Sequence, residues 1–136
     1  ENDIDPLYTG DEIEYLRSLP EYVVLPTAMV NILFSHYVYP NLSGVGKTFL
    51  TYSDEFKMHF EFTRKKNCQV SFFGHTHTTG LWKVMQKKIK KYRFGKVAAL
   101  SGNNAISVPS IALNGKRNGF CIFDIEEETV QSFRIY

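Results

Sequence analysis

Apolar and polar positions change from helical to strand spacing within the first 35 residues of the chain. A capping box at Thr9 and Glu12 precedes apolar residues at helical spacing, which predicts a short helix at 10–18. The segment 21–26 has the composition of a strand, and 29–35 is nearly continuously apolar, as in strands covered on both faces. The pattern therefore predicts one helix followed by two strands.

A second helix and a series of short strands follow. Aromatic residues fall on one stripe between about 51 and 66, which predicts a helix, and His59 lies off that stripe, so we expect it on the surface. No long helical pattern occurs after Lys66. Short strands are expected at 70–73, 81–86, 96–100, 105–111, 119–125 and 129–136.

Length and composition indicate one globular domain. The 136 residues are 43% hydrophobic, enough to bury a core, and no apolar run approaches the roughly 18 residues of a membrane span. The two cysteines are not in a paired spacing such as CxxC, which indicates a reducing compartment, and we expect a cytoplasmic protein that binds no membrane. Because residue 1 is Glu rather than Met, we expect the chain to be part of a larger gene product.

Charge is divided unevenly along the chain. Residues 1–46 contain seven acids and one base, whereas residues 47–136 contain fifteen bases and seven acids. This asymmetry fits a basic face for a phosphate-bearing partner, and equally an acidic leader beside an ordinary basic surface. The densest basic run, 87–96, has too few aromatic residues for a base-stacking platform. We therefore interpret it as a hairpin whose lysines protect a sheet edge, and expect no nucleic-acid partner.

Histidines follow two of the predicted buried strands. His36 comes directly after 29–35, and His75 and His77 lie in SFFGHTHTTG at 71–80. Binding crevices of open sheets lie outside strand ends, and alternate residues on extended backbone point the same way, so the three imidazoles are expected to converge. Since neutral imidazole is the commonest protein metal ligand, the pattern predicts a metal site. The alternative is a His-x-His in a solvated turn.

The neighbours of His75 and His77 have supporting roles in this hypothesis. Gly74 allows a sharp backbone turn without a side chain that crowds the site. Three threonines keep the segment polar, and we expect their side chains to hold the imidazole nitrogens that do not face a metal. They are Thr76, Thr78 and Thr79.

The order of strand, His36, helix, FFGHTH and closing hairpins resembles the C-terminal half of a calcineurin-like metallophosphoesterase. That resemblance implies an α/β fold, a four-layered αββα sandwich with two metals at the strand ends, of which residues 1–136 form the C-terminal half as a single domain. It implies that His36 and His75 ligate one metal and His77 the other, in a dinuclear site of manganese, iron, zinc or nickel. The implied activity is hydrolysis of phosphoester bonds, by a phosphatase or a phosphodiesterase.

The other motifs of that family are not found in the chain. It lacks an Asp-x-His and a Gly-Asn-His motif, and no Asp stands in the context of the family's metal-bridging Gly-Asp. No catalytic residue is therefore assigned in this half, the chain alone is expected to be inactive, and the N-terminal half is expected from a lost segment or a second chain. Ser110 and Arg117, together with Asn103, are the candidates for contact with phosphate. The alternative function is an inactive member of the family that serves as a protein-interaction scaffold.

Overall fold

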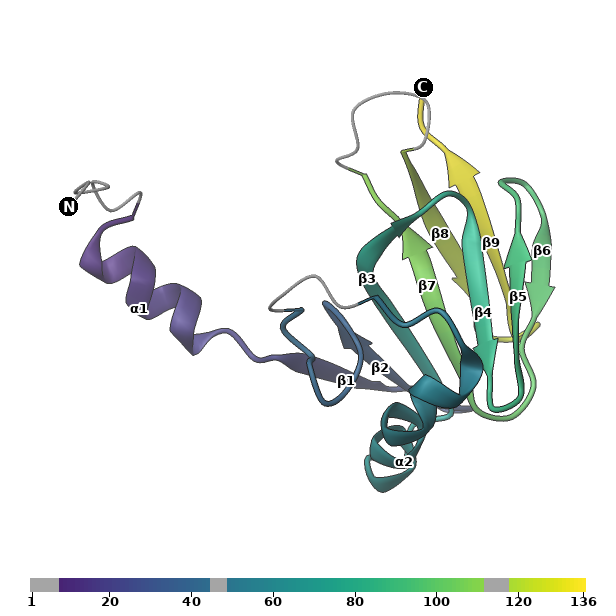
Figure 1. Cartoon of the computed structure of the whole chain (residues 1–136), viewed down its shortest axis with the longest axis horizontal. Helices are drawn as coiled ribbons and strands as arrows, with labels where there is room; N and C mark the ends of the chain where they lie inside the picture. The colour runs from purple at the N-terminus through teal and green to yellow at the C-terminus, as the bar shows by residue number, and fades with distance from the viewer. Residues whose placement is uncertain (1–7, 45–48, 112–117) are drawn as a thin grey trace.

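The computed structural model describes residues 8–44, 49–111 and 118–136. Two α-helices, one 3₁₀ helix (η1) and nine strands follow one another along these residues (Figure 1). Their bounds are α1 Gly10–Ser18, β1 Tyr22–Pro26, β2 Asn31–Ser35, η1 Ser53–Phe56, α2 Lys57–Lys65, β3 Val70–Thr78, β4 Leu81–Met85, β5 Lys88–Tyr92, β6 Val97–Ala99, β7 Asn104–Pro109, β8 Gly119–Asp124 and β9 Thr129–Arg134.

Helix α1 has the bounds that its capping box predicts. The backbone N–H of Thr9 donates to Glu12 Oε2 at 2.7 Å, and the Glu12 N–H donates to Thr9 Oγ1 at 3.3 Å. These two bonds satisfy donors that the first helical turn leaves without a partner. None of the helices in the described residues is long and apolar enough to cross a membrane.

The strands form two sheets. The larger has the order β1-β2-β3-β7-β4-β5, and the smaller has the order β6-β9-β8. In the larger sheet β2, β3 and β7 run parallel, while β1, β4 and β5 pair antiparallel with their neighbours. The three parallel strands therefore end at one edge of the larger sheet, which we call the carboxyl edge.

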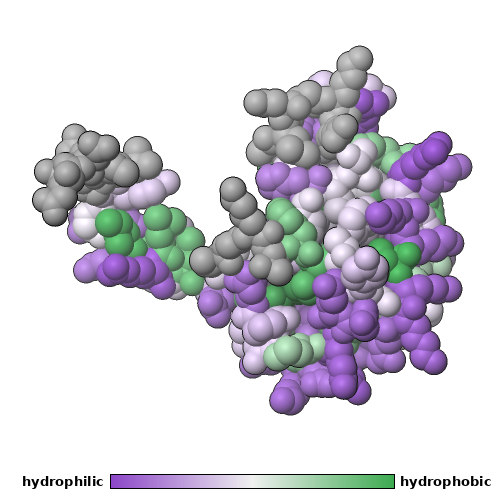
Figure 2. Space-filling view, in the orientation of Figure 1, coloured by the Kyte–Doolittle hydropathy of each residue, from purple (hydrophilic) through white to green (hydrophobic). Residues whose placement is uncertain are grey.

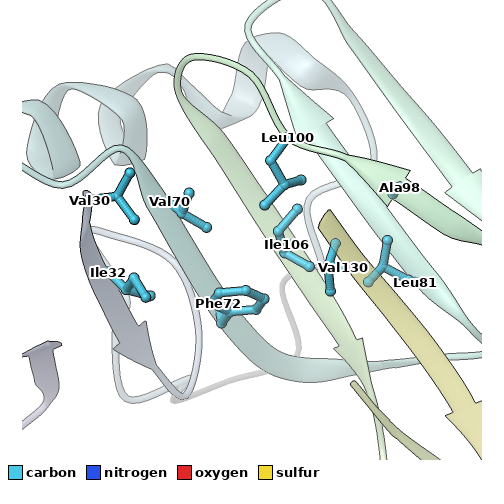
Figure 3. Close-up of a cluster of buried hydrophobic side chains, with 9 residues drawn as sticks. All are labelled: Val30, Ile32, Val70, Phe72, Leu81, Ala98, Leu100, Ile106 and Val130. Atoms are coloured by element: carbon cyan, nitrogen blue, oxygen red, sulfur yellow. The ribbon is translucent and has the colours of Figure 1, made fainter. Parts of the chain in front are cut away.

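Apolar side chains fill the space between the two sheets and between the larger sheet and α2. The cluster between the sheets is drawn in Figure 3 and joins residues from both of them, such as Phe72 and Ile106 of the larger sheet and Val130 of the smaller. A second cluster places Phe56 and Phe60 of the helical segment against Phe73. Helix α2, the larger sheet and the smaller sheet are thus three layers.

The four-layered αββα sandwich expected from the resemblance is wrong for the described residues. Strand accounts for 42% and helix for 18%, so the domain is small and β-rich. Helix α1 has no buried residue and projects away from the sheets (Figure 1), and Figure 2 shows hydrophobic side chains exposed on it. On the smaller sheet, Phe120 and Ile122 stay 43% and 55% exposed, so no helical layer covers them. A fourth layer would need a second helix packed on a sheet, and among residues 8–44, 49–111 and 118–136 only α2 is so placed.

His59 is a core residue, contrary to the surface position expected from its spacing. It is fully buried in α2. Its Nδ1 accepts a hydrogen bond from the Tyr39 N–H at 3.1 Å, so its Nε2 carries the proton and donates to Ser71 Oγ at 2.9 Å. Because burial disfavours the charged imidazolium, the pKa of His59 falls to about 4.

The free energy of unfolding is expected to decrease as the pH falls from 6.5 to 4. In this window unfolded His59, with its ordinary pKa of 6.5, binds a proton that the folded protein does not bind. The stabilisation is complete above pH 6.5 and lost by pH 4, with a difference of about 3 kcal/mol. Urea unfolding at several pH values measures it.

The variant His59→Asn is the control, because its side-chain oxygen still accepts the Tyr39 N–H and does not titrate in this window. It should be less stable at neutral pH but lose less stability between pH 6.5 and 4 than the parent. Equal pH slopes in parent and variant would contradict the burial of a neutral His59.

Candidate metal centre

His36 and His75 meet at the carboxyl edge. The parallel pairing of β2 with β3 places Ser35 opposite Phe73, and the Gly74 N–H then donates to the His36 carbonyl at 3.0 Å. His36 carries the accepting carbonyl and His75 is the residue after Gly74, so both imidazoles lie next to this hydrogen bond. His36 Nε2 lies 3.1 Å from His75 Nδ1. Adjacent parallel strands thus bring together two rings that are 39 positions apart in the sequence.

A separation of 3.1 Å between the two nitrogens fits two chemical states. Without a metal, one nitrogen carries a proton and donates it to the other. With a zinc ion about 2.0 to 2.1 Å from each nitrogen, the nitrogens would be about 3.0 Å apart at a right angle and about 3.4 Å apart at the tetrahedral angle. The observed distance lies between these values, so the pair fits two neighbouring ligands of one ion.

Aromatic rings hold the imidazole of His75. The Tyr37 ring lies 4.5 Å from it between centroids, and the Phe49 ring lies 5.3 Å away in a stacked arrangement. Tyr37 is itself buried, and its hydroxyl accepts the Leu50 N–H at 2.8 Å. His75 is half-buried and His36 is exposed, so the pair is accessible from solvent on the His36 side.

Gly44 lies directly against both rings. It has a φ of +71°, and a Cβ added to it would lie 2.6 Å from His36 Cδ2 and 2.7 Å from His75 Nδ1. Both distances are shorter than real contacts, so only glycine fits beside the pair in this arrangement. The sequence does not single out Gly44, because a glycine in a Pro-, Gly- and Ser-rich loop has many ordinary explanations.

The GHTH segment is a bulge, not the extended strand that was expected to aim His75 and His77 the same way. Strand β3 pairs with β7 at Phe73↔Ser107 and next at Thr78↔Pro109, so it advances five residues while β7 advances two. Both histidines have left-handed backbone, with φ of 58° and 48°. Non-glycine residues seldom adopt this conformation, and bulges with such strain are frequent at functional sites.

His77 is not part of the His36–His75 pair. It is exposed, and among residues 8–44, 49–111 and 118–136 no three His, Cys, Asp or Glu side chains lie close enough to hold a metal ion. The assignment of His77 to a second ion stays a prediction. The described residues therefore supply two imidazoles, which are neutral ligands suited to zinc, manganese, iron or nickel.

Ser107 fixes the bulge. Its buried hydroxyl lies 2.6 Å from Thr76 Oγ1 and 3.2 Å from Thr78 Oγ1. Thr76 also donates to the Gly74 carbonyl at 3.3 Å. Thr76 and Thr78 therefore form hydrogen bonds to β7 and to the backbone, whereas the sequence led us to expect hydrogen bonds to the imidazoles. Gly74 is also less constrained than expected, because an added Cβ would meet only the His36 carbonyl, at 3.6 Å.

The phosphate-contact candidates are divided by the direction of β7. Ser110 directly follows β7 and so lies at the carboxyl edge, where its carbonyl accepts the Gly119 N–H at 3.0 Å. Asn103 precedes β7, which places it at the opposite edge, away from the histidines. Arg117 lies outside the described residues.

A scan against protein-family models gave no match, and a search of the curated proteins gave none either. The resemblance to calcineurin-like metallophosphoesterases therefore depends on the motif residues alone.

Replacement of Ser107 by Ala should destabilise the protein by about 1 to 2 kcal/mol, because two hydroxyls lose their shared buried partner. Ser132→Ala is a matched control: Ser132 is equally buried, and its Oγ has no hydrogen-bond partner among the described residues. Its replacement should be neutral or slightly stabilising. Chemical denaturation of the two variants compares them, and an equal cost would contradict the anchoring role of Ser107.

Replacement of Gly44 by Ala should lower the affinity for Zn²⁺ or Co²⁺ by about 10- to 100-fold, the usual effect of a disturbed ligand support. The added methyl group must displace one of the two imidazoles. Gly102→Ala is the control, because Gly102 has a similar φ of +65° but no atom within 4 Å of an added Cβ. Both variants carry the same backbone strain, so a difference between their metal affinities reports the contact of the added methyl group with the imidazoles. Competition with a chromophoric chelator measures these affinities, and equal values in the two variants would contradict the role of Gly44.

Proposed function

We propose that the chain contributes the histidine side of a metal-dependent phosphoesterase site, in which His36 and His75 ligate one divalent transition-metal ion. The observation that supports this proposal best is the 3.1 Å approach of His36 Nε2 to His75 Nδ1 at the ends of two adjacent parallel strands. Ligands of open α/β sheets bind at such strand ends. Phosphoester hydrolysis is the activity that the FFGHTH resemblance implies for such a site.

The residues of the chain would bind and orient rather than transfer protons. His36 and His75 would act as neutral ligands, and Gly44 would fix the angle between their rings. Tyr37 and Phe49 would keep the His75 ring from rotating out of the site. An ion held there would supply Lewis-acid activation of the phosphoester. His77, exposed on the same bulge, is the candidate ligand for a second ion.

The proposal requires carboxylates from outside the described residues. Two neutral imidazoles complete neither the ligand number nor the charge balance of a divalent ion. A partner, either the N-terminal half of the same domain or a second chain, would supply the Asp and Asn ligands and the catalytic group. The activity would then belong to the completed site.

An inactive interaction scaffold is the second candidate function. It is favoured by the lack of any three-ligand group among the described residues. In that case the two histidines would keep only their hydrogen bond, and metal would neither bind at the pair nor change the rate of phosphoester cleavage.

Metal analysis together with intact-mass measurement of the purified, undenatured protein tests the proposal. We expect transition metal to accompany the protein, in larger amount when a second polypeptide is present. In the protein completed by its N-terminal half or by the second polypeptide, His36→Asn and His75→Asn should each lower the metal content and reduce the rate of bis(p-nitrophenyl) phosphate hydrolysis at least 100-fold, since each removes a ligand. His77→Asn distinguishes a site with one ion from a site with two. Loss of half the metal in this variant would show that His77 ligates a second ion. Unchanged metal content and hydrolysis in His75→Asn would exclude the phosphoesterase function.

A further inference from the structure

The positive charge of the chain is concentrated in one uninterrupted stretch. Between Phe62 and Phe123 there is no Asp or Glu, while twelve of the sixteen Lys and Arg residues lie there. This stretch includes the C-terminal end of α2 and the strands β3, β4, β5, β6 and β7. Within the larger sheet the basic side chains of this stretch lie on β4 and β5, and none of the strands of this sheet carries a carboxylate. Figure 2 shows hydrophilic side chains gathered on the β5 and β6 side of the molecule.

The topology brings part of this charge to the same edge as the histidine pair. β4 is antiparallel to β7, and β5 is antiparallel to β4, so β5 runs in the direction of β3 and β7 and ends at the carboxyl edge (Figure 1). Arg93 follows β5 directly. The turn after the GHTH bulge touches it, because an added Cβ on Gly80 would meet the Tyr92 carbonyl and lie 3.4 Å from the Arg93 Cα.

The turn that carries this charge is held in place. The Lys96 N–H donates to the Arg93 carbonyl at 3.1 Å, and the Gly95 N–H donates to the Ser132 carbonyl of β9 at 2.7 Å. Both Arg93 and Lys96 are exposed. Two cationic side chains are thus presented to solvent from a backbone that is bonded to both sheets.

We propose that the substrate of the site is a polyanion whose further phosphate groups extend along the carboxyl edge from the His36–His75 pair to Arg93 and Lys96. This proposal depends on the proposed function. The pair lies at the end of β2 and β3, and three strand spacings separate β3 from β5, about 14 Å. A single phosphate cannot span that distance, whereas a chain of several phosphates can. The basic stretch matches such a chain in charge.

Aromatic residues of this region are already covered by lysines, which favours recognition of phosphates over bases. Lys91 Nζ lies 4.0 Å from the centre of the Trp82 ring, and Lys90 Nζ lies 4.9 Å from that of Tyr92. In each of these cation–π contacts a lysine occupies one face of the ring and competes with a base for it. The same phosphate chemistry occurs in linear polyphosphate and in single-stranded nucleic acid.

Lys83 indicates that the positive field here is not neutralised. Its ammonium donates to the Ala99 carbonyl at 2.6 Å, between the sheets. Burial first, and then the charges of Lys90 and Lys88, lower the pKa of Lys83.

Binding of linear polyphosphate and of a 12-nucleotide single strand, each measured by titration at several salt concentrations, tests the proposal. Arg93→Gln/Lys96→Gln should weaken both ligands about 10-fold or more and reduce the salt slope for the single strand by about 1.4. Lys65→Gln/Lys66→Gln is the matched control, because it removes the same charge where β3 begins, at the opposite edge. The control should leave the affinity nearly unchanged.

Each other outcome overturns the proposal. Equal loss in the two double variants would show attraction by net charge only, and no measurable binding by the parent would remove the polyanion site. Much tighter binding of the oligonucleotide than of polyphosphate of equal charge would show contacts to bases instead of phosphates. All titrations are made in metal-free buffer with the parent and the two double variants, so they do not depend on a metal ion at the histidine pair. The binding arms therefore remain interpretable if the metal and hydrolysis measurements disprove the phosphoesterase function.

Discussion

The parallel pairing of β2 with β3 is the interaction on which the candidate site depends. The pairing ends with the hydrogen bond from the Gly74 N–H to the His36 carbonyl, and beyond that bond the two segments separate. A shift of one residue in this register would turn every side chain of β3 to the other face. Phe72 would then leave the cluster between the sheets, and His75 would leave His36. The core and the histidine pair are therefore set by the same register.

Helix α2 stabilises that register from the other side of the sheet. Its buried His59 connects Ser71 of β3 with Tyr39 of the loop that follows β2. One neutral imidazole thus forms hydrogen bonds to both segments next to the site. The same loop leads from Tyr37, which packs on His75, to Gly44, which packs on both rings. His59 joins three segments, namely α2, β3 and the loop after β2. Because a buried polar group without partners costs stability, the loop is favoured in the one position that satisfies His59.

The sequence predicted those features that depend on local physics. The capping box defined α1, apolar runs located most strands, and a polar residue after each buried strand indicated that His36 and His75 would meet. It failed where distant residues decide the outcome. His59 is buried beside the expected stripe because Tyr39 and Ser71, which lie on other segments, satisfy its two ring nitrogens, and the GHTH bulge depends on Ser107, 31 positions from Thr76. Gly44 has no local signal, because its constraint is a contact with two side chains. The expectation of four layers came from the family resemblance, and α1 does not form the fourth layer because it packs on neither sheet.

Electrostatics connects the incomplete ligand set with the basic stretch. Neutral imidazoles leave a divalent ion with its full charge, and β4 and β5 of the same sheet add cations without any carboxylate. A bound cation is unfavourable in such surroundings unless anions come from elsewhere. Carboxylates of a partner could supply them permanently, and the phosphates of a substrate could supply them during binding. If both act, the first would set the affinity for the ion, and the second would make ion and polyanion each bind more tightly in the presence of the other, because their coupling free energy is reciprocal.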